Sequence, residues 1–377
     1  MMACASARDP RMRYASSMSD NGAVFEIAGH QVEPGRTVDI ELKVSESYTG
    51  LDIHVPVRAM RGKQPGPAVF VMAGIHGDEL NGTGIIRRLL ADDSLSLKTG
   101  TLVLVPHVNV LGLDTLSRYL PDRRDLNRSF PGSPQGSLAS RFAAKFFREI
   151  VKKCDYGIDL HSAAVRRTNF PNIRADMSDP KVRMLAESFG CELIVHGTGP
   201  SGSLRRAACR AGIPTIILEA GEVWKIEPSV AEFGVRGVRN VLAALGLISA
   251  PRRRPAFAAV AERTTWVRAR HGGFLDFHVA PGEIVEKGEA LATNSGLLGS
   301  HRRVLTSPVE GIVLGMTTLP AVSPGDPVFH IAVPNEGIAP IRKALRRASD
   351  TSLTHRLRDD LATNVALTNR TRRTPDD

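Results

Sequence analysis

The sequence has few cysteines and no long apolar run. Only four of its 377 residues are cysteines (Cys4, Cys154, Cys191 and Cys209), with no C-x-x-C pair, so neither a disulfide framework nor a thiolate zinc site is indicated. No segment approaches the roughly 20 apolar residues of a membrane-spanning helix. The N-terminal segment also lacks the apolar stretch of a secretory signal peptide. We therefore expect a cytoplasmic protein without a membrane partner, with a disordered leader at 1–22.

The net charge of +10 is concentrated in two short segments. Residues 251–271 carry six Arg against one Glu, and residues 341–377 carry nine Arg or Lys against five Asp. The rest of the chain is nearly neutral, and basic linkers and tails are more often solubilising than specific readers of nucleic acid. No specific nucleic-acid partner is expected, whereas a homodimer or higher homo-oligomer remains possible because such assemblies are common.

Four regions follow one another along the chain. Behind the leader, residues 23–250 begin with entry strands and then alternate short β-branched runs with helical stretches. Residues 251–336 open with a Pro- and Arg-rich linker and continue with short strands at close spacing, which predicts a small all-β domain. Residues 337–377 have the composition of a frayed helix within a basic, largely disordered tail.

The alternation of strand and helix in residues 68–248 predicts an α/β fold. Its sheet is expected to be mostly parallel but mixed, with helices on both faces. In such a sheet the functional crevice lies beyond the carboxyl ends of the strands. Polar side chains that directly follow apolar strands are therefore the candidates for a site.

Two strands end in residue types that bind metals. In AVFVMAGIHGDE the strand ends at Ala73, and the following turn carries His76 and Glu79, whose spacing lets both face one ion. The strand YGIDLH ends at His161, two residues after Asp159, which is placed to orient an imidazole. Two histidines and one carboxylate are a ligand set of catalytic zinc, which keeps a position for water.

A third strand, PTIILEAGE, places Glu219 directly behind three apolar residues. An ionised carboxylate there is costly unless it is paired or used by the site. Hydrolysis at a metal needs a group that accepts a proton from water and returns it to the leaving amine, and Glu219 is the candidate. The alternative is a structural ion pair between Glu219 and a buried arginine.

The segment SRYLPDRRDLNRSFPG concentrates arginines and amides in a loop flanked by Pro and Gly. Such side chains suit carboxylate oxygens, so an anionic substrate group is implied. This segment is also compatible with a capped turn, and a lone histidine after a strand is more often structural than a ligand. The coincidence of all these groups in one chain favours the functional interpretation. The residues concerned are Arg118, Arg123, Arg124, Asn127 and Arg128.

Together, GIHGDE, DLNRSFPG, IDLH and ILEAG resemble the succinylglutamate desuccinylase/aspartoacylase family, which is related to zinc carboxypeptidases, over roughly residues 23–335. The resemblance implies one Zn²⁺ per subunit on His76, Glu79 and His161, with Glu219 as general base and acid. It also implies that Asn127 and Arg128 bind the substrate carboxylate. Arg118, in an Arg-Tyr pair before DLNR, corresponds to the family residue that polarises the scissile carbonyl, although Pro121–Arg124 lengthens the spacing.

Residues 274–332 resemble the barrel-sandwich hybrid fold of biotinyl and lipoyl carriers. Asn294 to Val304, where a carrier presents its lysine, contains no Lys, so no covalently attached cofactor is expected. Two roles stay open for this unit: it walls the active-site entrance, or it forms an oligomer contact.

The predicted function is hydrolysis of a small N-acylated amino acid or related amide by attack of zinc-bound water. A carboxypeptidase-type peptidase and a non-catalytic binding protein on the same fold are the alternatives. Two segments, RRTNFPNIRADM and HGTGPSGSLRR, are expected to be the loops that set specificity. In the first of them, Arg166, Arg167 and Arg174 either read an acidic acyl group or are simply solvated. By analogy with related deacylases, an acetylated diamino acid is one possible substrate.

Overall fold

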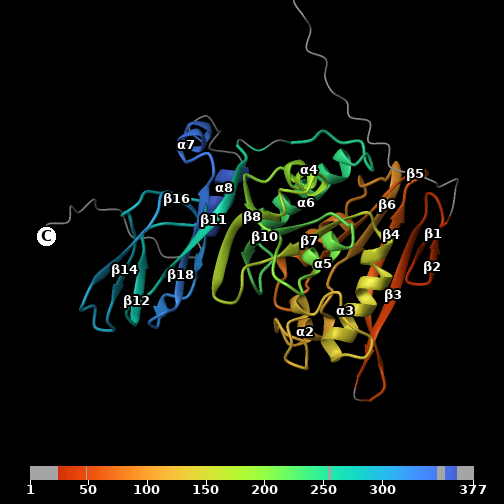
Figure 1. The fold of residues 1–377 in the computed structure, drawn as a ribbon, viewed down its shortest axis with the longest axis horizontal. Helices are drawn as coiled ribbons and strands as arrows, with labels where there is room; N and C mark the ends of the chain where they lie inside the picture. Colours follow the sequence, from red (N-terminus) through yellow and green to blue (C-terminus); the bar gives the residue numbers. More distant parts are fainter. Residues whose placement is uncertain (1–23, 48, 254, 256, 346–352, 363–377) are drawn as a thin grey trace, which may run out of the picture.

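The computed structural model describes residues 24–47, 49–253, 255, 257–345 and 353–362, so the predicted leader lies outside it. A twelve-stranded sheet runs through the molecule, with the N-terminal strands at one end and the C-terminal strands at the other (Figure 1). In spatial order its strands are β13 (Ile284–Val285), β16 (Gly311–Thr317), β18 (Pro327–Pro334), β11 (Ala259–Arg268), β9 (Leu193–His196), β8 (Arg167–Ala175), β10 (Thr215–Glu222), β7 (Tyr156–His161), β5 (Gln64–Ala73), β6 (Thr99–Val105), β4 (Asp52–Arg61) and β3 (Thr37–Glu46).

Parallel pairing occupies the middle of this sheet. Strands β6, β5, β7 and β10 are parallel neighbours, and so are β8 with β9 and β9 with β11. Strand β8 runs antiparallel to β10, and the strands at both ends pair antiparallel. The sheet is mixed as predicted, but "mostly parallel" describes only its centre, because apolar periodicity carries no information about strand direction.

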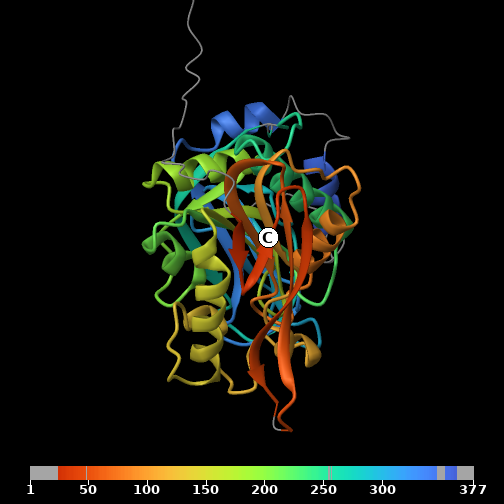
Figure 2. The same ribbon diagram turned by 90° about the vertical axis from the view of Figure 1, so that its right-hand side faces the viewer.

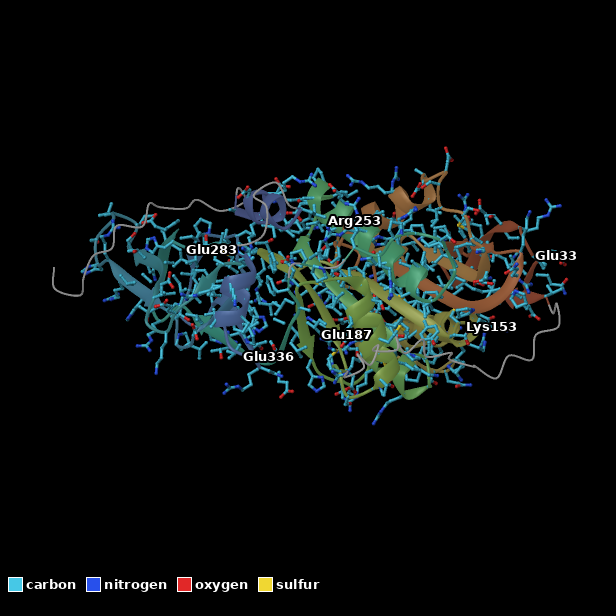
Figure 3. All side chains as sticks on the ribbon, turned by 90° about the horizontal axis from the view of Figure 1, so that it is seen from above. Glu33, Lys153, Glu187, Arg253, Glu283 and Glu336 are labelled. Carbon is cyan, nitrogen blue, oxygen red and sulfur yellow. The ribbon has the colours of Figure 1, made fainter. Side chains whose placement is uncertain are left out.

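The long β3–β4 hairpin forms the N-terminal end of the molecule and faces the viewer in Figure 2. A separate small hairpin joins β1 (Phe25–Ile27) and β2 (His30–Val32). Viewed from above, Glu33 after this hairpin and Glu283 in the C-terminal region lie at opposite ends of the molecule (Figure 3).

Helices cover both faces of the sheet, as predicted. Side chains of β5 alternate between two cores: Val69 and Val71 pack with α1, α4 and α6, whereas Phe70 and Met72 pack with α3 and α5. This alternation follows from the two-residue period of a strand. The helices are α1 (Asn81–Leu90), α2 (Val110–Asp114), α3 (Leu138–Glu149), α4 (Pro180–Phe189), α5 (Leu204–Arg210) and α6 (Pro228–Ala244), with the 3₁₀ turns η1 (Leu126–Arg128) and η2 (Val151–Lys153).

Local sequence sets several helix boundaries. Asp179 caps α4 by accepting hydrogen bonds from the Lys181 and Val182 amides, Pro180 occupies its first position, and Gly190 ends it in the left-handed region (φ +80°). Asp as N-cap, Pro at the first turn and Gly at the end are the residues that these positions favour. None of the described helices is both long and apolar enough to cross a membrane.

Part of the C-terminal region continues the main sheet. Strand β11 pairs with β9, and β16 pairs with β8. A second, four-stranded sheet consists of β12 (Gly273–Phe277), β14 (Ala290–Ser295), β15 (Arg303–Thr306) and β17 (Ala321–Val322). An apolar core joins it to β16 and β18, as in the packing of Phe277 against Phe329. Every regular element in 259–334 is a strand, while the barrel-sandwich likeness stays a prediction.

The C-terminal tail, where a frayed helix was predicted, contains two helices. Helices α7 (Ala339–Leu345) and α8 (Leu353–Ala362) are present, and residues 346–352 and 363–377 lie outside the described chain. Leu353, Leu357 and Leu361 place one apolar stripe of α8 into the core that also contains α6. The composition of the tail concealed this stripe because polar residues dominate the other faces of the helix.

Candidate active site

One cavity of about 380 Å³ brings together all seven residues predicted for the site. It lies between the central strands, the loop before α3, the segment leading into α5 and two strands of the C-terminal region. Its predicted lining residues are His76, Glu79, Arg118, Asn127, Arg128, His161 and Glu219. The convergence inferred from strand ends is therefore present.

A tight turn after β5 places His76 and Glu79. Gly74 has φ +65°, and a Cβ there would collide with the His107 ring, so both the conformation and the space require glycine. The turn precedes α1, which begins only at Asn81. His161 ends β7, where it pairs in register with Glu219 of β10.

We call His76, Glu79 and His161 the His/Glu group. His76 Nδ1 lies 2.6 Å from Glu79 Oε1, and His161 Nδ1 lies 2.9 Å from Glu79 Oε2. One donor atom from each of the three buried side chains lies within 4.8 Å of the others, so the group is able to hold a metal ion. Two imidazoles and one carboxylate match catalytic zinc in ligand type and number.

The other nitrogen of each imidazole is held by a carboxylate. His161 Nε2 lies 2.9 Å from Asp159 Oδ2, the pairing expected from sequence, and His76 Nε2 lies 3.2 Å from Asp125 Oδ1. Such carboxylates fix the tautomer so that Nδ1 faces the metal position. The contact of Asp125 with His76 was not predicted. Asp125 is the first residue of the DLNR motif, and no local sequence pattern links it to His76.

The charges in and around the His/Glu group strongly lower the pKa values of Glu79 and Asp125. Burial alone would raise the pKa of Glu79, but the positive charges of His76 and His161 outweigh it and hold the pKa far below the usual range. The same holds for Asp125: burial alone would raise its pKa, but hydrogen bonds to His76 and Arg118 lower it. Both carboxylates therefore remain ionised, as metal ligation and its support require.

Arg118 lies against the His/Glu group. Its Nη2 donates to Asp125 Oδ2 at 2.8 Å, and its Nη1 lies 3.6 Å from Glu79 Oε1. Asp125 thus anchors His76 and Arg118 together. Tyr119, the other half of the predicted Arg-Tyr pair, is 48% exposed and is not among the residues lining the cavity.

Asn127 and Arg128 lie on the 3₁₀ turn η1. Asp125 caps this turn by accepting a hydrogen bond from the Asn127 amide at 2.8 Å, so the capped turn and the functional site coexist. Asn127 Oδ1 accepts from the Leu204 amide at the start of α5, at 2.8 Å. Its oxygen is thereby engaged, which leaves the amide nitrogen to serve the cavity.

Glu219 lies within β10 beside a bulge between Glu219 and Gly221, three residues before the strand ends. Asn169 Nδ2 donates to Glu219 Oε2 at 3.1 Å, and Arg174 Nε lies 3.4 Å from Oε1. The arginine partner considered as an alternative is therefore present. It does not remove Glu219 from the cavity, whose wall includes both side chains.

The segments expected to set specificity both reach the cavity, but RRTNFPNIRADM is strand β8 and not a loop. Arg167 and Arg174 line the cavity, whereas Arg166 is exposed. From HGTGPSGSLRR, His196 and Arg205 take part. Trp266 of β11 and His330 of β18 also line the cavity, and no sequence pattern pointed to them.

Comparisons with known proteins identify the domain that carries this cavity. Residues 65–245 match the model of the succinylglutamate desuccinylase/aspartoacylase catalytic domain. The N-alpha-acetyl-L-2,4-diaminobutyric acid deacetylase of Halomonas elongata is 26% identical over 297 residues, covering 74% of this chain and 86% of that protein.

Solved structures share the fold at low sequence identity. A succinylglutamate desuccinylase/aspartoacylase from Rhodobacter sphaeroides has a TM-score of 0.69 at 23% identity, over 78% of this chain and 95% of its own. A product-bound ectoine utilization protein from Ruegeria pomeroyi has a TM-score of 0.71 at 22% identity, over 79% and 95%. Residues 65–245 are therefore identified as a succinylglutamate desuccinylase/aspartoacylase catalytic domain.

Proposed function

We propose that the protein is a zinc-dependent deacylase that hydrolyses the amide bond of a small N-acyl amino acid. The observation that carries this proposal is the single cavity in which the His/Glu group, Glu219 and several arginines lie together. The family and the curated deacetylase of Halomonas elongata support amide hydrolysis as the reaction class.

The side chains of the cavity have different roles in the proposed reaction. His76, Glu79 and His161 would hold the zinc, which would supply Lewis acidity and so make water acidic enough to react near neutral pH. Glu219 accepts the proton of the attacking water and delivers it to the leaving amide nitrogen. Asn169 holds the Glu219 carboxylate in the required direction.

Charged donors orient the substrate. Arg128 and Asn127 bind the carboxylate of the amino acid, because a guanidinium and an amide nitrogen together match its oxygens. Arg118, beside the His/Glu group, is placed to stabilise negative charge on the carbonyl oxygen as it develops. Products are a carboxylate and a free amine.

Small amides are favoured over peptides as substrates. Trp266 and His330 of the C-terminal region line the cavity, whose volume is about 380 Å³. This observation favours a wall at the active site as the role of the C-terminal strands. Assembly into homo-oligomers stays a separate prediction.

Elemental analysis of the purified protein tests the metal, with His76→Ala as the comparison. We expect near-stoichiometric zinc in the wild type and a loss of zinc in the variant. Absence of metal from both would contradict the site and favour a non-catalytic binding protein.

Amine release from a panel of N-acyl amino acids and short peptides tests the reaction. Glu219→Gln should keep its zinc while turnover falls by roughly 10²–10⁴, the usual contribution of general acid–base catalysis. Retained turnover in this variant would exclude Glu219 as the base. Faster hydrolysis of peptides than of N-acyl amino acids would replace the deacylase by the carboxypeptidase-type alternative.

A further inference from the structure

The strand order separates two kinds of side chain along the cavity. His161 lies on β7, Glu219 on the next strand β10, and Arg167 and Arg174 on β8 beyond it. Neighbouring strands are ~4.8 Å apart. The arginines of β8 therefore lie on the side of Glu219 that faces away from the His/Glu group.

The C-terminal strands complete this side of the cavity. Trp266 of β11 and His330 of β18 are cross-strand partners, and their rings stack at 4.1 Å with an interplanar angle of 5°. The guanidinium of Arg167 lies 5.1 Å from the centre of the Trp266 ring. Stacking holds the planar group in place while its N–H donors stay available at the edge.

His330 belongs to the same cluster. Burial, together with the positive charges of Arg174 and Arg167, lowers its pKa to about 4. The imidazole is therefore neutral near pH 7, and both guanidiniums are close enough to affect it. Its buried Nε2 makes no hydrogen bond within the described residues.

The cluster has too few anions for its cations. Among the described residues no Asp or Glu oxygen lies within 4.0 Å of Arg167, and its more distant charged neighbours, Arg268 and Asp326, have opposite signs. Within the described residues, Glu219 is the one Asp or Glu within 4.0 Å of Arg174: its Oε1 lies 3.4 Å from the buried Nε, but the two atoms form no hydrogen bond. Buried donors without acceptors are unfavourable, so the arrangement suits an anionic ligand.

We infer that Arg167, Arg174 and His330 form a second anion subsite, which binds a second carboxylate of the substrate beyond Glu219. This inference rests on the proposed amide hydrolysis, with Asn127 and Arg128 binding the first carboxylate. It makes the substrate a diacid: the additional carboxylate belongs either to a dicarboxylic acyl group or to an acidic amino acid. We call these three residues the arginine subsite.

Two matched pairs of substrates test the subsite and distinguish the two sources. N-succinyl-L-alanine and its neutral succinamyl analogue differ only at the end of the acyl group, and N-acetyl-L-aspartate and N-acetyl-L-asparagine differ only in the amino-acid side chain. We expect kcat/KM of the wild type to favour the charged member of one pair by about tenfold or more, the usual strength of a charge-assisted hydrogen bond.

The variants Arg167→Met, Arg167→Lys and Arg166→Met are compared on the same pairs. Arg167→Met should abolish the preference mainly through KM, Arg167→Lys should retain part of it, and the exposed neighbour in Arg166→Met should leave it unchanged. A wild type that treats both pairs alike, or a preference that survives Arg167→Met, would overturn the subsite.

Failure of the reaction and failure of the subsite are separable. If none of the four compounds is hydrolysed, the proposed function fails, and calorimetric binding of the same compounds then decides the subsite by itself. Binding of the charged member at least tenfold tighter than the neutral one in the wild type, lost in Arg167→Met, supports it. Equal binding refutes it.

Discussion

The two ends of the cavity differ in how completely their charged groups are paired. In the His/Glu group each ring nitrogen faces a carboxylate, and Asp125 holds His76 and Arg118 at once. In the arginine subsite, two guanidiniums and a neutral imidazole have, among the residues that the structure describes, only Glu219 as an anionic partner within 4.0 Å. The first end is complete as a ligand set for a cation, whereas the second becomes neutral only when an anion binds.

The difference between the two ends explains how one cavity is able to combine a reaction with the selection of its substrate. Carboxylates that fix the imidazoles belong to the chemistry and leave little freedom for change. Guanidiniums with few anionic partners are able to bind different anions, so we expect substitutions there to alter substrate choice without removing the proposed reaction. Glu219 lies between the two ends: it pairs in register with His161 on one side, and on the other it contacts Arg174 and Asn169 of β8.

The largest expected effect comes from breaking the first end. His161→Ala removes one of three ligands, and we expect loss of both bound zinc and all measurable turnover. Elemental analysis and amine release from the same preparation measure the two losses. Arg167→Met, at the other end, should keep its zinc; equal zinc loss in both variants would erase the distinction between the ends.

A smaller effect is expected when the ligands stay and only their support changes. Asp159→Asn removes the charge that holds His161 Nε2, and we expect zinc affinity to fall roughly 10–100-fold. Competition with a metal chelator measures this change. Unaltered affinity would mean that Asp159 serves folding alone.

The next effect links the C-terminal region to Glu219. A Cβ at Gly315 of β16 would collide with Asn169 Oδ1 and approach the Thr168 carbonyl to 2.8 Å. Gly315→Ala should therefore displace Asn169 from Glu219 and lower kcat by about tenfold, the loss of one hydrogen bond to a charged group, while zinc content stays constant. Gly272→Ala is the matched control, because a Cβ there meets no atom closer than 3.5 Å.

The smallest effect concerns stability instead of turnover. The pKa of His330 is lowered from 6.5 to about 4 in the folded protein, so the unfolded chain binds the proton more readily. Its contribution is complete above pH 6.5 and is lost as pH falls toward 4, by about 2 kcal/mol between pH 7.5 and 5. His330→Asn should lose less stability over this interval than the wild type.

Urea unfolding at the two pH values measures that interval. His301→Asn, which replaces an exposed histidine of the same region, is the control and should follow the wild type. An identical pH dependence in His330→Asn would show that His330 is not held neutral by its surroundings, which would weaken the electrostatic description of the arginine subsite.

The first end of the cavity was accessible from the sequence, and the second was not. His76, Glu79 and His161 follow apolar strands whose carboxyl ends must meet at one edge of a parallel sheet. The segment that carries Arg167 and Arg174 was expected to be a loop. Its alternation of polar and apolar residues does not reveal that it is a strand lying between two other strands. The direction of this strand could not be predicted either: β8 runs antiparallel to β10, and no local sequence pattern indicates strand direction.

The amino-acid sequence was enough to predict the alternation of strands and helices, the three residues of the His/Glu group, Asp159 beside His161, and Glu219 behind an apolar run. Each depends on local periodicity or on residues close in the chain. The contact of Asp125 with His76, the packing of α8 on the core, and the approach of Trp266 and His330 to the cavity follow from the fold and not from local sequence. Asp125 and His76 are 49 positions apart, and the paired residues Trp266 and His330 are 64 apart, and pairing over such separations depends on the packing of whole elements.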